Sequence, residues 1–404
     1  MKKFVSLCIS LFLICLTFQN VYADDSLKLN SQYAYLYDPQ TSLVYMNQGS
    51  DERIYPASMT KILTVKVALE KISDLKEKVK VEKVDYNGLF EANASIAWLD
   101  IGEVVTYEDL LYGALLPSGA DACQALARLT YGSLDAFVEA MNKKIESLGL
   151  QNTHFSNVTG LHDDDHYTTP KEMAFILNDA LSDSRFVPIF EARNYTSSNN
   201  RHQWSSTLER AALQKIDISH IDGAKSGFTD EALLTLASTM TIDGHQLILV
   251  TAKASGQYSQ NHVKDAVSTY NYMQNHYHRI DLYKKDQEIA DYWILDSLNF
   301  HYHYTADCDI SILTTNDISH DDLSISIEAK KVLKSPINEG TSVGEVHIDY
   351  QNESLYHFTL NIKQTIQRNM VLFVLRYVLL IFVIFYCIRK LCIKIRKRKR
   401  RTSH

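Results

Sequence analysis

The stretch of sequence that decides the fold is YPASMTKILT, residues 55–64, which places Ser58 three residues before Lys61. Positions three apart share one face of a helix, so the serine hydroxyl and the lysine amine can touch. A serine hydroxyl becomes a nucleophile when a base takes its proton. An amine can be that base when burial or nearby positive charge lowers its pKa, and the helix N-terminus also disfavours an ammonium. The pattern therefore predicts a serine nucleophile and a lysine base at the start of a helix.

The same spacing occurs a second time, at Ser73 and Lys76, within a charged stretch from Lys71 to Lys83. The first copy has the stronger context. Pro56 precedes it, and the residues after Lys61 are apolar on several faces, which is typical of a buried helix. We expect the second copy to be a solvated helix end.

Two later elements complete a three-part pattern. Ser118 lies in LLPSGADA, residues 115–122, and Lys225-Ser226-Gly227 lie in DGAKSGFTD, residues 222–230. The order S-x-x-K, S-x-N and K-[ST]-G is the signature of the penicillin-recognising serine enzymes. On these motifs the mature chain resembles the D-alanyl-D-alanine carboxypeptidases among the low-molecular-mass penicillin-binding proteins. Further stretches that resemble the family are residues 56–64, 109–113, 115–122, 152–155, 160–163, 166–169 and 223–231.

The resemblance implies an α/β fold: a penicillin-binding or β-lactamase-like sheet-and-helix catalytic domain, followed by a small β-rich domain. It implies that Ser58 is the nucleophile, Lys61 the base and Ser118 a proton relay. Substrate binding is expected from Lys225, Ser226, Gly227 and Phe228, with the oxyanion between the N–H groups of Ser58 and Phe228. The implied substrates are peptidoglycan stem peptides ending in D-Ala-D-Ala, and β-lactam antibiotics are the implied covalent inhibitors. No metal or organic cofactor is implied.

The chain departs from the family pattern at two points. Ala120 stands where the second motif normally ends in Asn, and residues 254–265 contain no arginine where the family usually has one for the substrate carboxylate. The missing amide predicts slower turnover. The alternative is that the side chains around this position have repacked to suit alanine. His162, Asp163 and His166 match a family loop, in which a structural role is at least as plausible as a catalytic one.

Two other functions stay open at this stage. A penicillin-binding protein that acylates and then stalls is compatible with Ala120. A β-lactamase shares the three motifs, but no motif for a deacylating Glu is evident, and a C-terminal β-domain with a membrane anchor is unusual for that class.

Both ends of the chain carry targeting signals. A charged start, a short apolar core and a small-residue site predict a cleavable signal peptide over residues 1–23. Residues 370–388 are apolar except for Arg376, which can reach outer headgroups, and are long enough for a transmembrane helix. The basic tail at residues 389–404 predicts a cytoplasmic C-terminus. We therefore expect a single-pass protein of the cell membrane whose catalytic ectodomain is extracytoplasmic.

Charge and cysteine content exclude other classes. The 404 residues include 41 Lys and Arg and 48 Asp and Glu. Setting aside the nine basic residues between Arg389 and Arg401, together with Lys2, Lys3 and Arg376, leaves 29 basic residues and a net charge of −19 for the ectodomain. Such a surface argues against nucleic acid as a partner. Only Cys123 and Cys308 lie in the ectodomain, so a disulfide scaffold is not expected.

The catalytic domain is expected over residues 24–278. Strands are predicted at 32–37 and 43–47, helices at 58–71, 106–116, 121–129, 133–148 and 263–276, and a hairpin at 233–253 around Asp243-Gly244. Residues 279–366 alternate as short strands and form the β-rich domain. His301 and His303 share one face of a strand there. With no third ligand identifiable in the sequence, they are predicted to be solvated rather than metal-bound.

Overall fold

The computed structural model describes residues 27–401, with side chains up to residue 395. The predicted signal peptide lies outside the described residues. The chain forms two compact units, of which the first ends at His278 and the second begins at Arg279. Each unit is described by itself.

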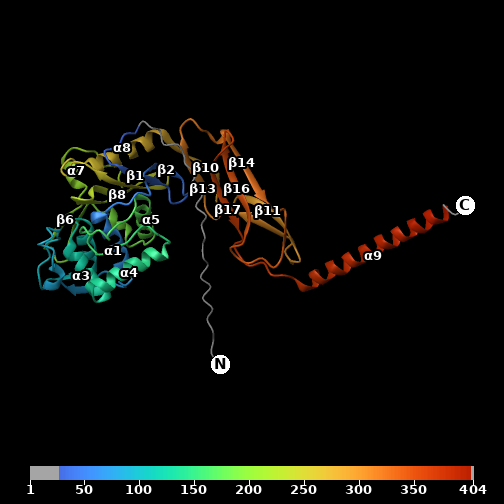
Figure 1. Ribbon diagram of the computed structural model, residues 1–404, viewed down its shortest axis with the longest axis horizontal. Coiled ribbons are helices and arrows are strands. Elements are labelled where there is room, and N and C mark those ends of the chain that lie inside the picture. Colours follow the sequence, from blue (N-terminus) through green and yellow to red (C-terminus); the bar gives the residue numbers. More distant parts are fainter. Residues whose placement is uncertain (1–26, 402–404) are drawn as a thin grey trace, which may run out of the picture. The chain divides into compact units, whose positions relative to one another are not determined.

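A five-stranded antiparallel sheet is the centre of the first unit, with strand order β2-β1-β9-β8-β7. Its strands are β1 (Tyr33–Tyr37), β2 (Val44–Gln48), β7 (Gly223–Thr229), β8 (Leu233–Ile242) and β9 (His245–Ala254). Side chains on both faces of β8 and β9 are buried, so the sheet needs a helical layer on each side. Helix α8 (Asn261–His276) packs on β8 and β9, and α5 (Pro170–Leu181) packs on β1 and β9 from the other side (Figure 1).

The predicted hairpin is confirmed. Asp243 and Gly244 form the two-residue turn between β8 and β9, and both have positive φ values of 48° and 86°. That backbone suits a primed turn, whose twist matches the flanking strands.

The remaining helices of this unit are α1 (Thr60–Leu69), α2 (Tyr107–Leu115), α3 (Ala120–Tyr131), α4 (Leu134–Ser147), α6 (Val187–Glu191) and α7 (Glu209–Leu213), with 3-10 turns η1 (Ala57–Met59) and η2 (Lys83–Tyr86). Among them, α2, α3 and α4 pack on α1. Two short hairpins complete the unit: β3 (Lys78–Lys80) with β4 (Val104–Thr106), and β5 (Asn194–Thr196) with β6 (Gln203–Ser205).

Local sequence signals account for several helix boundaries. Thr106 accepts a hydrogen bond from the N–H of Asp109 and caps α2, as predicted. Ser133 caps α4 in the same way through Ala136, and Gly149 follows that helix with a φ of 73°. All ten residues of α1 are buried, which confirms the expectation from its all-round apolar sequence.

The start of the first helix differs from the prediction. Ser58 lies in the 3-10 turn η1, and the α-helix proper begins at Thr60. Tight turns of this kind are common at helix N-termini. The serine and the lysine still face one another, because a separation of three residues spans one turn in either geometry.

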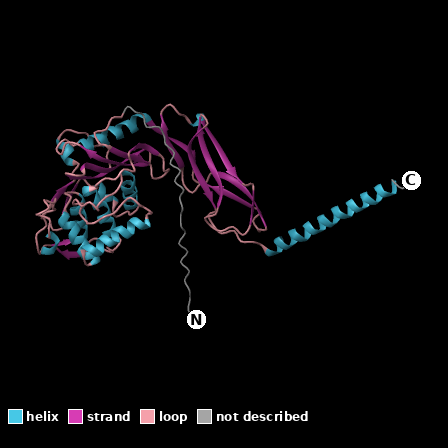
Figure 2. Cartoon of the chain, viewed as in Figure 1, coloured by secondary structure: helices cyan, strands magenta, loops and turns pink. Residues whose placement is uncertain are grey.

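The second unit is built almost entirely from strands (Figure 2). Strand β10 (Tyr277–Tyr283) leads into it and pairs with β13 (Ile310–Thr315). A three-stranded sheet has the order β12-β11-β15, and another has the order β14-β16-β17. These six strands are β11 (Glu288–Leu295), β12 (His301–Thr305), β14 (Leu323–Ala329), β15 (Val332–Lys334), β16 (Ser342–Tyr350) and β17 (Glu353–Asn361), with a 3-10 turn η3 (His320–Asp322).

A long terminal helix, α9 (Met370–Arg401), follows the second unit's strands. Its segment Met370–Ile395 is long and apolar enough to cross a membrane, and none of its most apolar window is buried against protein. The Arg376 guanidinium lies 3.0 Å from the carboxylate of Asp296, whose side chain is 1% exposed. Arg376, near the start of the apolar segment, is therefore paired with the β-domain rather than left to lipid headgroups alone.

Candidate active site

A cleft of about 890 Å³ opens in the first unit, and most of the predicted site residues line it. Its walls come from segments far apart in the sequence: η1 and α1, the loop before α3, the loop at residues 159–162, helix α7 and strand β7. Of the seven predicted residues, Ser58, Lys61, Ser118, Ser226, Gly227 and Phe228 line it. Lys225 is the exception, because it is 1% exposed and lies behind the cleft wall.

The centre of the cleft is the contact between Ser58 and Lys61. The Lys61 Nζ lies 2.9 Å from the Ser58 Oγ and donates a second hydrogen bond of 2.6 Å to the carbonyl oxygen of Thr159. Lys61 is only 2% exposed. Burial lowers the pKa of this amine, against the opposing negative charge of Asp121. The arrangement places a hydroxyl next to an amine that burial makes easier to deprotonate.

Two glycines let other backbone segments approach the nucleophile closely. A Cβ at Gly160, which has a φ of 83°, would lie 1.9 Å from the carbonyl oxygen of Ala57. A Cβ at Gly227 would lie 2.7 Å from the backbone N of Ser58 and 2.6 Å from Thr235 Oγ1. All three distances are far below van der Waals contact, so β7 and the 159–162 loop can flank Ser58 only without side chains at these positions.

The third motif lies on the edge strand β7, where side chains alternate between two faces. Ser226 points into the cleft and donates a 2.8 Å hydrogen bond to the hydroxyl of Thr207. Lys225 is buried, and its Nζ lies 3.1 Å from the carbonyl oxygen of Ser226. Burial, and then the positive charges of Lys61 and Arg210, lower the pKa of Lys225 well below its ordinary value.

Ser118 has a strained backbone conformation just before the N-terminus of α3. Its φ is 66°, in the left-handed region that disfavours side chains. Its Oγ is buried and has no hydrogen-bond partner among the described residues. Strained residues with an unsatisfied polar group concentrate at functional sites, so these two features make Ser118 a candidate functional residue.

The second S-x-x-K copy is solvated, as predicted, but it lies in a loop rather than at a helix end. Ser73 and Lys76 are both exposed in the loop after α1, and Lys76 forms an ion pair with Glu108. Neither residue lines the cleft.

The family-loop histidines have separate roles. His166 is 2% exposed, and its Nε2 lies 2.7 Å from Thr60 Oγ1 while its Nδ1 accepts from the N–H of Ser156. Burial lowers the pKa of His166 to about 3, so the neutral ring connects α1 to this loop. His162 lines the cleft and packs edge-on against Tyr55.

Sequence reasoning missed several residues of the cleft. The Thr159 carbonyl that holds Lys61 carries no sequence signal, because any residue supplies one. Arg210 lies on α7 and Thr207 precedes that helix. Both line the cleft close to β7. They lie in a segment without a recognisable motif, so only the fold could bring them to the site.

A half-buried serine beside a buried lysine, in a cleft at the edge of a five-stranded antiparallel sheet with helices on both faces, defines a penicillin-recognising serine enzyme. Residues 19–256 match the family described as D-alanyl-D-alanine carboxypeptidase, and residues 277–368 match the C-terminal domain of penicillin-binding protein 5. The chain belongs to this D-alanyl-D-alanine carboxypeptidase family and is a serine-type hydrolase.

Individual relatives agree with this assignment. The D-alanyl-D-alanine carboxypeptidase DacF of Bacillus subtilis is 30% identical over 83% of this chain and 85% of its own length. The crystal structure of penicillin binding protein 5 from Haemophilus influenzae has the same fold, with a TM-score of 0.74, 23% identity, and coverage of 86% of this chain and 100% of that one. The Streptomyces K15 DD-transpeptidase is 28% identical, with a TM-score of 0.55 over 62% of this chain and 98% of its own.

The position of Ala120 generates a prediction about turnover. Ala120 is 1% exposed and packs in a small apolar cluster with Leu89 and Ile96, although it also borders the cleft. We expect Ala120→Asn to lower both activity and stability, because a buried amide without partners costs about 1–3 kcal/mol. The measurements are the rates of penicillin release and of D-Ala release, together with the free energy of unfolding. Faster deacylation at unchanged stability would contradict this expectation and show that the missing amide limits turnover.

Proposed function

We propose that this chain removes the terminal D-alanine from peptidoglycan pentapeptide stems and that β-lactams acylate the same serine. The observation that carries the proposal is the 2.9 Å contact between Ser58 Oγ and the Nζ of a lysine that is 2% exposed. Because the amine is desolvated, it can accept the serine proton instead of remaining an ammonium.

The proposed reaction has two steps. Neutral Lys61 takes the proton of Ser58, whose Oγ attacks the carbonyl carbon of the penultimate D-Ala. The C–N bond then breaks, Ser118 relays a proton to the leaving amine, and D-Ala departs. Water hydrolyses the resulting ester and regenerates Ser58. The backbone N–H groups of Ser58 and Phe228 are proposed to hold the developing oxyanion, which is consistent with the close approach of Gly227 to the Ser58 nitrogen.

The substrate carboxylate is proposed to bind between β7 and α7. Ser226 already faces this part of the cleft beside Thr207. Burial lowers the pKa of Lys225, and an incoming carboxylate would raise it again because an opposite charge nearby favours the ammonium. Arg210 lines the cleft, is exposed, and pairs with no carboxylate among the described residues. It can therefore replace the arginine that the family usually carries after the hairpin.

The first test distinguishes Ser58, the proposed nucleophile, from Ser73, the serine of the second S-x-x-K copy. We expect Ser58→Ala to abolish labelling by a fluorescent penicillin and release of D-Ala from a pentapeptide, since the Ser58 hydroxyl is the one held against the Lys61 amine. Ser73→Ala should leave both unchanged. Covalent labelling of the Ser58→Ala protein would refute the assignment. Product analysis in the presence of an amine acceptor separates hydrolysis from transpeptidation, the activity for which the Streptomyces K15 enzyme is named.

A second test concerns Arg210. A hydrogen bond to a charged group contributes about 1.5–3 kcal/mol, so we expect Arg210→Ala to lower kcat/KM for D-Ala release by roughly tenfold to a hundredfold. Lys215→Ala is the matched control, because it removes a neighbouring exposed charge that does not line the cleft. A pentapeptide with an amidated C-terminus should react equally with wild type and Arg210→Ala. An equal loss on both substrates would show that Arg210 does not bind the carboxylate.

For localisation, we propose that α9 anchors the chain in the cell membrane, with the strands outside and the basic end of the helix in the cytoplasm. The supporting features are the apolar segment Met370–Ile395 and the cluster of basic residues after it. Protease added to wall-stripped cells should remove the ectodomain but spare a tag placed after His404. Loss of that tag without permeabilisation would reverse the proposed orientation.

A further inference from the structure

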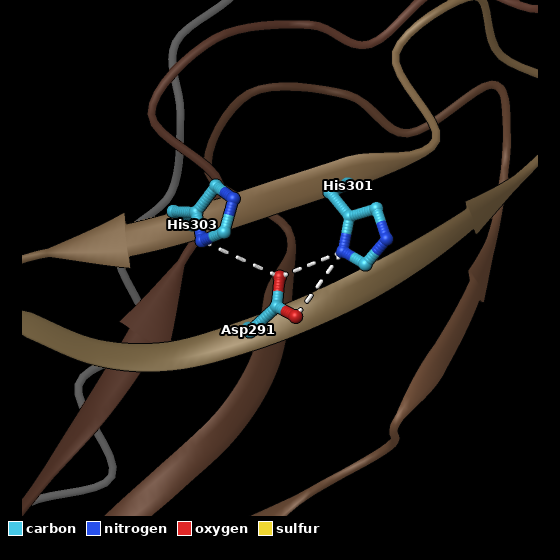
Figure 3. A group of neighbouring side chains, drawn as sticks. All are labelled: Asp291, His301 and His303. Carbon is cyan, nitrogen blue, oxygen red and sulfur yellow. Dashed lines mark hydrogen bonds and ion pairs between the residues drawn. The ribbon is translucent and has the colours of Figure 1, made fainter.

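A group of metal-ligating side chains lies on the surface of the second unit, in a different unit from the catalytic residues. Figure 3 shows Asp291 on β11 and His301 and His303 on β12, with both imidazole rings turned toward the carboxylate. One ligand atom from each of the three residues lies within 4.8 Å of the others. The sequence-based expectation of two solvated histidines without a third ligand is therefore incomplete, because the third group comes from the neighbouring strand.

The strand register explains why these residues meet. In the antiparallel pair, Asp291 is directly opposite His303 and Trp293 is directly opposite His301. Side chains two apart share a face, so all four project from one side of the sheet. These residues do not form a short sequence motif, because Asp291 lies ten positions before His301.

A β-bulge adds a fourth group to the same face. The register shifts between Glu288 and Ala290, so that Glu288 pairs with Thr305. A regular strand would point residues 288 and 291 to opposite faces, but one extra residue reverses the alternation. The Oε2 of Glu288 consequently lies 3.1 Å from the Nδ1 of His303.

The spacing of these atoms suits a small divalent ion. The Nδ1 of His301 is 3.1 Å from one oxygen of Asp291, and the Nδ1 of His303 is 3.5 Å from the other. In tetrahedral zinc sites the bonds to nitrogen and oxygen are about 2.0–2.2 Å, which separates neighbouring ligand atoms by roughly 3.4 Å. Asp291, His301 and His303 thus need little rearrangement to share one ion, and Glu288 lies beside them through its 3.1 Å contact with His303.

The charge of the group also calls for a cation. Neither Asp291 nor Glu288 pairs with a lysine or arginine among the residues whose side chains are described; their ion-pair partners are His301 and His303. With both imidazoles acting as metal ligands, the two carboxylates give the group a formal charge of −2, which a divalent ion balances. Imidazole ligands favour zinc and similar transition metals over Mg²⁺ or Ca²⁺, which prefer oxygen.

We propose that Asp291, His301 and His303 bind a divalent transition metal of the Zn²⁺ type, with Glu288 as the fourth ligand. Strand β12 is an edge of its three-stranded sheet, and both of its ligands would be joined through the ion to β11. The metal therefore fastens an edge strand to its neighbour. This site is independent of the catalytic proposal, because none of its ligands lines the catalytic cleft.

The test uses the full-length protein in detergent micelles, with a tag that contains no histidine, after removal of metal by a chelator. Titration with ZnCl₂ should show one site by calorimetry, and MgCl₂ or CaCl₂ should not compete. The Trp293 ring contacts the His301 ring in a tilted arrangement, with ring centroids 4.0 Å apart, so its fluorescence should change on binding. Co²⁺ should give the intense visible absorption of a tetrahedral site.

Matched variants identify the ligands. Changes to residues that only support a metal ligand typically cost tenfold to a hundredfold in affinity, so His303→Ala and the isosteric Asp291→Asn should each weaken Zn²⁺ binding by at least about tenfold. His320→Ala is the control, because His320 is as exposed as His303, at 58%, and also has an aspartate neighbour. Penicillin labelling should persist in every variant, and Asp291→Asn guards against loss of binding through misfolding.

Two outcomes would overturn the proposal. One is the absence of stoichiometric Zn²⁺ binding by the wild-type protein. The other is binding that survives His303→Ala and Asp291→Asn but is lost in His357→Ala, which would place the ion at the stacked pair of His347 and His357 instead.

Discussion

The catalytic unit depends on the removal of one amine from water. Lys61 sits at the head of a helix whose ten residues are all buried, and a carbonyl oxygen 2.6 Å away holds its Nζ beside the serine. An exposed lysine would remain an ammonium at neutral pH and could not accept a proton. Packing of α2, α3 and α4 on α1 therefore supplies the chemistry as well as the stability of the unit. Lys225 is affected in the same way, since burial, and then the positive charge of Lys61, lower the pKa of its amine.

Close backbone approach is the second requirement of the site. Strand β7 is an edge of the sheet, which leaves one of its sides open to ligands, and Gly227 lets this strand lie against the Ser58 nitrogen. Gly160 does the same for the loop on the other side. The left-handed φ values of Ala57 and Ser118 show that the surrounding packing holds the reactive segments in strained conformations. The result is a pre-arranged set of groups around one hydroxyl.

The two departures from the family pattern have different structural settings. Ala120 belongs to an apolar cluster, so the second motif here contributes packing where relatives contribute an amide. The arginine that the family pattern has after the hairpin is absent from residues 254–265. Arg210, on the short helix α7, lines the same cleft from another part of the chain. The second unit carries the proposed metal site on one face of β11 and β12. Its helix α9 is apolar over a length sufficient to cross a membrane.

Features that depend on neighbours in sequence could be predicted from the sequence itself. The contact of Ser58 with Lys61, the caps at Thr106 and Ser133, the turn at Asp243-Gly244 and the apolar length of α9 all follow from local periodicity and backbone preference. Features that join distant segments could not, because their partners carry no mutual signal. Only the tertiary structure decided that Thr159 holds Lys61, that Arg210 reaches the cleft, and that a bulge aligns Glu288 with Asp291 and His303. Sheet register and helix packing set those distances, and both depend on the whole core.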